Sequence, residues 1–286
     1  MLDASIKKTL KYLREKHYGS LAFLLEETWD RRPRNGNEYH IKMWEEQLAL
    51  NIPVLYLSCI CIHEFARKHN INNILFARRD CCHLHRIYHA LYLNENIHYF
   101  HCSRNMFEAA IDYSRPAFDR YVDKITDNDP IHTLYVDVHG TGRRMFDYFT
   151  KRGNGIPACF IISSAHDDVD GFSDDMKKMV KKGRAEFLVF NAGGSPIEMI
   201  NYDLIGTCND FTSNGPVRAP VEYDKKYVIP YHDCNEAFLK VIHENSSLDE
   251  SDHNIDNIID RIKHIYKPAL EDLPVISHWI KPERKH

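Results

Sequence analysis

Two kinds of hydrophobic pattern divide the chain. In the first seventy residues, apolar positions recur at helical spacing, as at Ile6, Leu10 and Leu13, and they predict helices. Pro53 suits the first turn of a further helix that ends near Asn70, because the N–H that proline lacks is not needed there. Beyond that helix, short apolar runs alternate with stretches of helical pattern. This alternation is typical of a parallel sheet with helical crossovers.

Five strands are expected in the alternating region. The apolar runs that predict them are residues 74–77, 97–101, 133–137, 158–163 and 186–191. The stretches that predict helices between them are residues 80–93, 115–124, 143–152 and 172–182. We therefore expect an α/β fold in which helical crossovers join a parallel sheet of about five strands.

The same patterns suggest three segments. They are a helical N-terminal segment (1–50), an α/β domain (51–232) and a helical C-terminal segment (233–286). Within the α/β domain, residues 192–232 are rich in Gly, Pro, Asn and Asp and are expected to be irregular. Two closing helices are expected at 234–245 and 254–267.

Composition places the chain among soluble globular proteins. It has 286 residues, 43% of them hydrophobic, and a formal net charge of −4, which gives no basic surface for a nucleic acid. The longest apolar run, residues 52–62, is shorter than the ~20 residues that span a bilayer. None of the eight cysteines forms a C-x-x-C pair. We expect a cytoplasmic protein with no membrane span and no nucleic-acid partner, and the oligomeric state is left open.

Polar residues follow the first three expected strands. Ligand sites of parallel sheets lie beyond the carboxyl ends of the strands, so these residues are expected to meet in one crevice. They are Arg78, Arg79 and Asp80 after the first strand, Ser103 and Arg104 after the second, and Asp137, His139, Gly140, Thr141, Gly142 and Arg143 at the third. Arginines bind phosphates through paired hydrogen bonds, and backbone N–H groups at a helix start bind another phosphate. The pattern therefore indicates a ligand with several phosphates and hydroxyls.

Other ligand-binding motifs fit the glycine loop less well. The loop lacks the third glycine of a dinucleotide fingerprint, and the chain has no Walker loop. A phosphatase of the haloacid dehalogenase type needs an acid where His139 stands. An S-adenosylmethionine-dependent methyltransferase remains an alternative, although its acid and glycine loop would follow the first strand of the sheet. On the helix after Asp80, only His85 and His89 share ligand spacing, so no metal site is expected there.

The strand-end segments resemble one family. The third block, LYVDVHGTGRRM, resembles the phosphoribosyl-pyrophosphate motif of type I phosphoribosyltransferases. Over roughly residues 50–205, three blocks are similar to the phosphoribosyltransferase-like modules of bacterial capsule and O-antigen assembly proteins. In chain order they are NNILFARRDCCHLHRIYHAL, HYFHCSRNMF and LYVDVHGTGRRMFDYF.

The resemblance implies a phosphoribosyltransferase-like fold and a role for each block. Asp137 would contact the ribose hydroxyls, and residues 140–143 would surround the 5-phosphate. Arg79 and Asp80 would lie at the pyrophosphate, with Arg78 beside them, and Ser103 and Arg104 would lie beside donor or acceptor. Arg79, Asp80 and Asp137 are thus the expected catalytic residues.

The implied reaction transfers a phosphoribosyl group from phosphoribosyl pyrophosphate to an unidentified acceptor, such as a glycan or polyol, and releases pyrophosphate. Mg²⁺ would be bound mainly through the substrate. Candidate bases are Asp80, His139 and Glu198, the last of which follows the segment NAGGSP. The acceptor pocket is expected from residues 1–50 and 192–232. A non-catalytic module that binds phosphoribosyl pyrophosphate and a methyltransferase are the alternatives.

Overall fold

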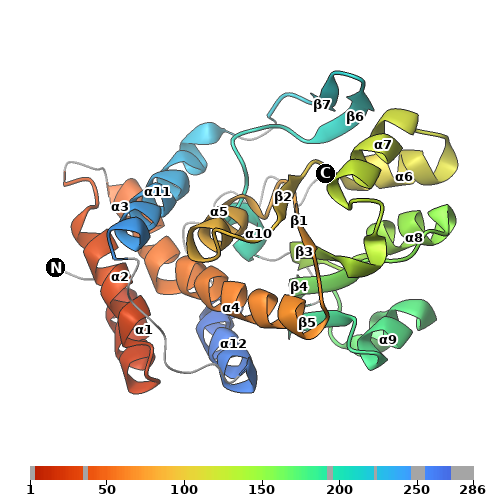
Figure 1. Cartoon of the computed structure of the whole chain (residues 1–286). Coiled ribbons are helices and arrows are strands. Elements are labelled where there is room, and N and C mark those ends of the chain that lie inside the picture. Colours follow the sequence, from red (N-terminus) through yellow and green to blue (C-terminus); the bar gives the residue numbers. More distant parts are fainter. Residues whose placement is uncertain (1–3, 35–37, 192–195, 222–223, 246–254, 272–286) are drawn as a thin grey trace.

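Five parallel strands form the centre of the fold (Figure 1). The computed structural model describes residues 4–34, 38–191, 196–221, 224–245 and 255–271. In it the strands are β1 (Asn73–Ala77), β2 (Ile97–Phe100), β3 (Thr133–Gly140), β4 (Ala158–Ser164) and β5 (Ala185–Phe190), in the order β2-β1-β3-β4-β5. The expected α/β fold with a five-stranded parallel sheet is confirmed. Each predicted strand begins within one residue of the observed one, and β3 extends three residues further.

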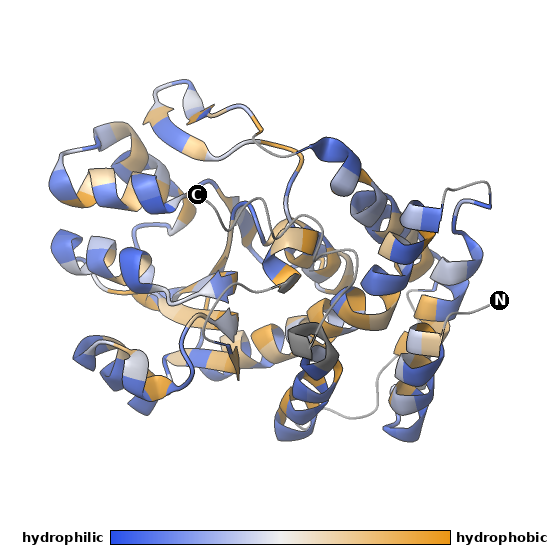
Figure 2. Cartoon of the chain, turned by 180° about the vertical axis from the view of Figure 1, so that it is seen from behind, coloured by the Kyte–Doolittle hydropathy of each residue, from blue (hydrophilic) through white to orange (hydrophobic). Residues whose placement is uncertain are grey.

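Helices cover both faces of the sheet (Figure 1). One layer holds α4 (Ile52–Lys68), α5 (Cys82–Leu91) and α12 (Ile255–Glu271), and the other holds α6 (Arg104–Asp112), α7 (Pro116–Ile125), α8 (Arg143–Arg152) and α9 (Asp174–Lys181). Because both faces are covered, β1 and β4 are buried along their whole length and are almost entirely apolar. Apolar positions accordingly concentrate in the sheet and on the sides of the helices that face it (Figure 2).

A further group of helices packs outside α4 and α5. It consists of α1 (Ala4–Glu15), α2 (Gly19–Asp30), α3 (Glu38–Glu46) and α11 (Ile229–Glu244). A π-helical turn, Gln47–Asn51, joins α3 to α4, so one continuous helix runs from Glu38 to Lys68. The expected divisions at residues 50 and 232 therefore fall inside helices, and one hydrophobic core extends across both.

The continuous helix Glu38–Lys68 is the one helix among the described residues that is long and apolar enough to cross a membrane. It is longer than the apolar run of residues 52–62 indicated. However, 83% of its apolar window is buried inside the fold. This burial is typical of the core helix of a soluble protein, which agrees with the expectation from composition.

Residues 192–232 contain more structure than the sequence predicted. They hold the short helix α10 (Pro196–Ile200) and an antiparallel hairpin of β6 (Cys208–Thr212) and β7 (Gly215–Arg218). Short 3₁₀ turns lie at Pro130–His132, Val169–Gly171 and Lys225–Tyr227. The closing helices are α11, which begins five residues earlier than expected, and α12. Residues 192–195 and 272–286 lie outside the described residues.

Candidate functional site

A cavity of about 370 Å³ lies at the carboxyl ends of the central strands. The chain crosses in one direction from β1 to β2 and in the other from β3 to β5, so the crossovers diverge between β1 and β3. Such a divergence is where open parallel sheets bind ligands. All twelve residues singled out from the sequence, including Glu198, line this cavity. The expected convergence of the strand-end blocks on one crevice is therefore observed.

The glycine loop between β3 and α8 needs glycine at its last position. Gly142 has φ +67° and stands directly before α8. A Cβ atom there would lie 2.9 Å from Sγ of Cys159, closer than carbon and sulfur normally approach. The Thr141 hydroxyl accepts a hydrogen bond of 3.3 Å from the backbone N–H of Arg143. The loop thus places the N-terminus of α8, with its partial positive charge, at the cavity.

Three carboxyl groups line the floor of the cavity. Asp137 accepts a hydrogen bond of 3.1 Å from the hydroxyl of Tyr135. Burial and the nearby charge of Asp80 raise the pKa of Asp137 to about 8. Burial also raises the pKa of Asp80, against the opposing charge of Arg79, and Asp80 shares a hydrogen bond with Glu198. Asp137 therefore retains its proton at neutral pH.

Arg79 is the cation nearest to these acids. Its Nε lies 3.3 Å from Oδ1 of Asp80, and its guanidinium lies 3.8 Å above the ring of Tyr202. Burial works to lower the pKa of Arg79, but the charges of Asp80, Tyr202 and Glu198 outweigh it and raise the pKa. The side chain is 28% exposed. Arg79 can therefore meet an anion that enters the cavity.

Arg78 also lines the cavity, but its side chain is paired with other residues of the protein. Its side chain is 4% exposed, and its Nη2 lies 3.1 Å from Oδ2 of Asp203. Its Nη1 donates a hydrogen bond of 2.9 Å to Nδ1 of His101. The peptide bond between Arg78 and Arg79 is cis. Because Asp203 neutralises its charge inside the protein, Arg78 supports the loop and has little charge left for a ligand.

The remaining strand-end residues differ in whether their side chains already interact with other residues of the protein. Ser103 caps α6, since its hydroxyl accepts from the N–H of Met106 at 3.1 Å and donates to the carbonyl of Cys208 at 2.6 Å. Arg104 is exposed at the cavity and has no ion pair with any residue that the structure describes. Arg143 is exposed too and lies 3.7 Å from a carboxylate oxygen of Asp147. The two exposed arginines make the entrance cationic.

His139 occupies an intermediate position in the cavity wall. It follows Val138 near the end of β3, and its Nδ1 lies 3.4 Å from the hydroxyl of Ser163 on β4. That hydroxyl also receives a hydrogen bond of 3.1 Å from Tyr266 of α12. The ring is half-buried and is therefore held by the sheet instead of moving freely in the cavity.

The hairpin of β6 and β7 closes one side of the cavity and was not predicted. Gly206, Thr207 and Cys208 line the cavity beside it. Arg218 of β7 donates a hydrogen bond of 2.9 Å to Nδ1 of His101, the same atom that accepts from Arg78. Burial and the charge of Arg78 lower the pKa of His101 to about 4, so the ring is neutral. The Asn-Gly pair at 214–215 is a hairpin signal that could have revealed this element.

The two segments from which an acceptor pocket is expected differ in their relation to the cavity. Residues 198 and 206–208 do line the cavity, as expected of the segment 192–232, but none of its lining residues comes from residues 1–50. The N-terminal helices pack instead against α11 and the turn Gln47–Asn51. Tyr202 and Asp203, which hold the two arginines, had no local signal, because they meet them only through contacts more than a hundred residues apart in sequence.

The arrangement combines the groups that a phosphorylated sugar requires. Arg79, the two entrance arginines and the N-terminus of α8 can bind phosphates. The carboxylates can accept hydrogen bonds from hydroxyl groups, and as oxygen ligands they suit Mg²⁺. The cavity volume lies within the ~300–1,000 Å³ usual for small-molecule sites.

No protein-family model matches the chain, and no curated protein matches it either. The residues of the cavity and their geometry are therefore the basis for a functional proposal. They favour a ligand with several negative charges and several hydroxyls, since cations surround the entrance and acids line the floor.

Proposed function

We propose that the protein transfers a phosphoribosyl group from phosphoribosyl pyrophosphate to an acceptor such as a glycan or polyol and releases pyrophosphate. The observation that carries the proposal is the meeting of three strand-end blocks in one cavity, with Arg79, Asp137 and the loop 140–143 on its wall. A phosphoribosyl donor presents a phosphate, two ribose hydroxyls and a pyrophosphate. Each of these groups has a chemical partner among the lining residues.

We assign each part of the donor to lining residues of matching charge. The N-terminus of α8 and the loop 140–143 bind the 5-phosphate, because the partial positive charge at the start of the helix lies at the cavity and attracts an anion. Asp137 accepts hydrogen bonds from the ribose hydroxyls. Arg79 binds the pyrophosphate, with Arg104 at the entrance. Mg²⁺ accompanies the pyrophosphate and adds positive charge at the leaving group.

In the reaction, the bond between ribose C1 and the pyrophosphate oxygen breaks, and the electron pair leaves with pyrophosphate. A bond forms between C1 and the acceptor oxygen, whose proton passes to a base. Negative charge on pyrophosphate grows as its bond to C1 breaks, so Arg79 contributes most in the transition state. The rate therefore depends on Arg79 more than donor affinity does.

The pair of Asp80 and Glu198 is the favoured base. The two carboxyl groups share a hydrogen bond, and burial raises the pKa of Asp80 toward the range in which a carboxylate takes up a proton efficiently. His139 is the other candidate, but its Nδ1 lies near Ser163. A base made of two acids also explains why Glu198, from α10, lies so close to the end of β1.

Calorimetry separates this proposal from its alternatives. We expect phosphoribosyl pyrophosphate with Mg²⁺ to bind, and S-adenosylmethionine, a cation at sulfur that has no phosphate, not to bind. If the protein bound S-adenosylmethionine but not phosphoribosyl pyrophosphate, the result would favour a methyltransferase. Binding of the donor without release of pyrophosphate, with any acceptor or with water, would favour a non-catalytic binding module.

A further inference from the structure

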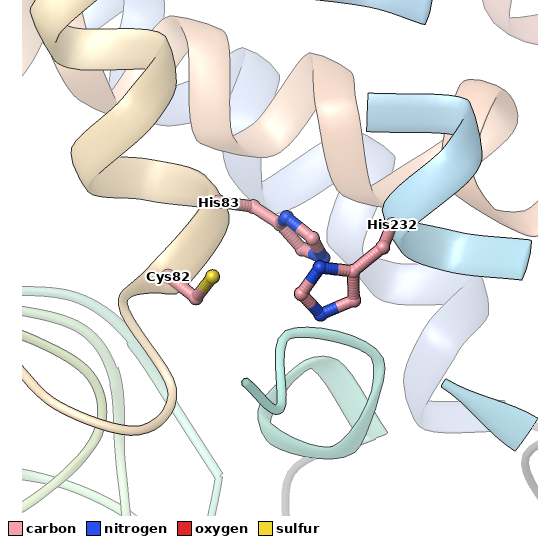
Figure 3. Close-up of side chains that lie close together, drawn as sticks. All are labelled: Cys82, His83 and His232. Atoms are coloured by element: carbon pink, nitrogen blue, oxygen red, sulfur yellow. The ribbon is translucent and has the colours of Figure 1, made fainter. Parts of the chain in front are cut away.

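Behind the strand-end arginines, three side chains bring metal-ligand atoms together (Figure 3). Cys82 and His83 belong to the first turn of α5, and His232 belongs to α11. Their ligand atoms all lie within 4.8 Å of one another. None of the three lines the candidate substrate cavity, so they form a separate cluster. The sequence predicted no metal site on this helix, and nothing in it placed His232 beside Cys82 and His83.

His83 is the first reason to regard the cluster as more than packing. Its side chain is fully buried, and neither ring nitrogen has a hydrogen-bond partner among the residues that the structure describes. A buried polar group without a partner destabilises the fold. The ring lies 4.4 Å from the ring of His232, centre to centre. A metal ion in the space between the three side chains would give His83 the missing partner.

His232 is oriented as a metal ligand. Its Nε2 donates a hydrogen bond of 2.8 Å to the backbone carbonyl of Tyr202, which leaves a lone pair on Nδ1 of the neutral ring. In Figure 3 the other ring nitrogen of His232 faces His83. Histidine ligands in proteins usually make such a hydrogen bond from the nitrogen that does not bind the metal. The side chain is 9% exposed, so water competes little for Nδ1.

We propose that Cys82, His83 and His232 bind a zinc ion. One thiolate and two imidazoles form a ligand set that prefers Zn²⁺ to Mg²⁺, and the thiol proton is released to solvent when the metal binds. Tetrahedral zinc would bring the ligand atoms to about 3.3–3.6 Å from one another, so the side chains would move closer together when the metal binds. Water can occupy the fourth position, and the charge of Asp203 acts on both Cys82 and His232.

The proposed zinc would tie the outer helix α11 to the loop that carries the arginines. Cys82 and His83 follow Arg79 and Asp80 after one intervening residue, Cys81, and His232 donates a hydrogen bond to the backbone carbonyl of Tyr202. The ring of Tyr202 lies under Arg79, while its neighbour Asp203 pairs with Arg78. A metal at the cluster would therefore fix the position of both arginines without touching a substrate.

Cobalt titration of the metal-stripped, full-length protein tests the proposal without any substrate. We expect one Co²⁺ per chain, with the absorption of a cobalt–thiolate bond, displaced by Zn²⁺, and a higher melting temperature with zinc. Cys82→Ser, which preserves volume, should lose that absorption. His232→Ala should weaken metal binding by about 100-fold or more, because even changes in the second shell cost about 10–100-fold. His89→Ala, an exposed histidine of the same helix, should bind as the wild type does.

Two results would overturn the zinc site. The wild-type protein could take up Co²⁺ without thiolate absorption, a measurement that needs no variant to fold. Alternatively, the absorption could persist in Cys82→Ser, which would assign the metal to another thiol. Neither result bears on phosphoribosyl transfer, because the titration contains no donor.

Discussion

Asp137 shows what the proposed chemistry demands of a single residue. Its carboxyl group lies within β3 and near Asp80, and both burial and that neighbour raise its pKa to about 8. The fold therefore holds this carboxyl group in place although it disfavours the charged form. Such a group is more useful to a ligand with hydroxyls or a cation than to the protein core.

The raised pKa predicts a pH-dependent effect of Asp137→Asn on stability. In the unfolded chain an aspartate ionises near pH 4, so the wild type loses stability as pH rises above about 4 and stops losing it above about 8. Asparagine cannot ionise. We expect the variant to be as stable as the wild type at pH 4 and more stable by at least ~1 kcal/mol at pH 8, since one pKa unit corresponds to about 1.4 kcal/mol. Urea unfolding at both pH values measures this, and a variant that is less stable at pH 8 would contradict it.

The same substitution should weaken donor binding. A hydrogen bond from a hydroxyl to a charged carboxylate contributes about 1.5–3 kcal/mol, so Asp137→Asn should raise the Kd for phosphoribosyl pyrophosphate by about 10–100-fold. Asp175→Asn, at an exposed position of α9, is the matched control and should bind normally. Calorimetry at pH 8 gives both values. Equal affinity in wild type and Asp137→Asn would remove Asp137 from the site.

At the scale of elements, the junction of β3 and α8 determines where a phosphate can bind. Gly142 and Gly153 stand at the two ends of α8 with nearly the same φ, +67° and +72°. A Cβ atom would meet Cys159 at position 142 and would meet nothing within 4 Å at position 153. Alanine substitutions at the two positions therefore separate the stability cost of a left-handed backbone from the cost of the close contact with Cys159.

We expect Gly153→Ala to destabilise the protein by about 1–2 kcal/mol, the cost of a left-handed residue with a side chain. Gly142→Ala should cost more, and it alone should weaken donor binding, because the added methyl group moves the loop at the start of α8. Unfolding and calorimetry on the pair provide the comparison. Equal losses in stability would show that the packing against Cys159 is unimportant.

The elements also show what sequence can and cannot predict. The five strands were recognisable because helices cover both faces, which makes runs such as 74–77 wholly apolar. The strand-end residues were recognisable because parallel strands present their carboxyl ends on one edge. The hairpin of β6 and β7 was missed, since its residues are largely polar and half-exposed. Tyr202, Asp203 and His232 could not be predicted, because tertiary contacts alone bring them to β1 and α5.

At the scale of the whole molecule, one continuous core joins the sheet to the outer helices. The helix Glu38–Lys68 runs from the outer layer to the sheet layer, and α11 contacts α2, α3 and α5. The cavity takes its wall from β1, β3 and the segment 198–208, which are distant in sequence. Donor binding should therefore depend on the complete fold and not on any one segment.

The central claim is that the cavity catalyses transfer, with Arg79 on the leaving group. The most direct test measures pyrophosphate release from phosphoribosyl pyrophosphate with Mg²⁺ and a panel of sugar and polyol acceptors. We predict release by the wild type, a loss of about 10²–10³ in rate for Arg79→Ala with a much smaller change in donor Kd, and normal release by Arg120→Ala, an exposed arginine of α7 outside the cavity. A wild-type protein that does not bind the donor, or an Arg79→Ala variant that releases pyrophosphate as fast as the wild type, would contradict the account.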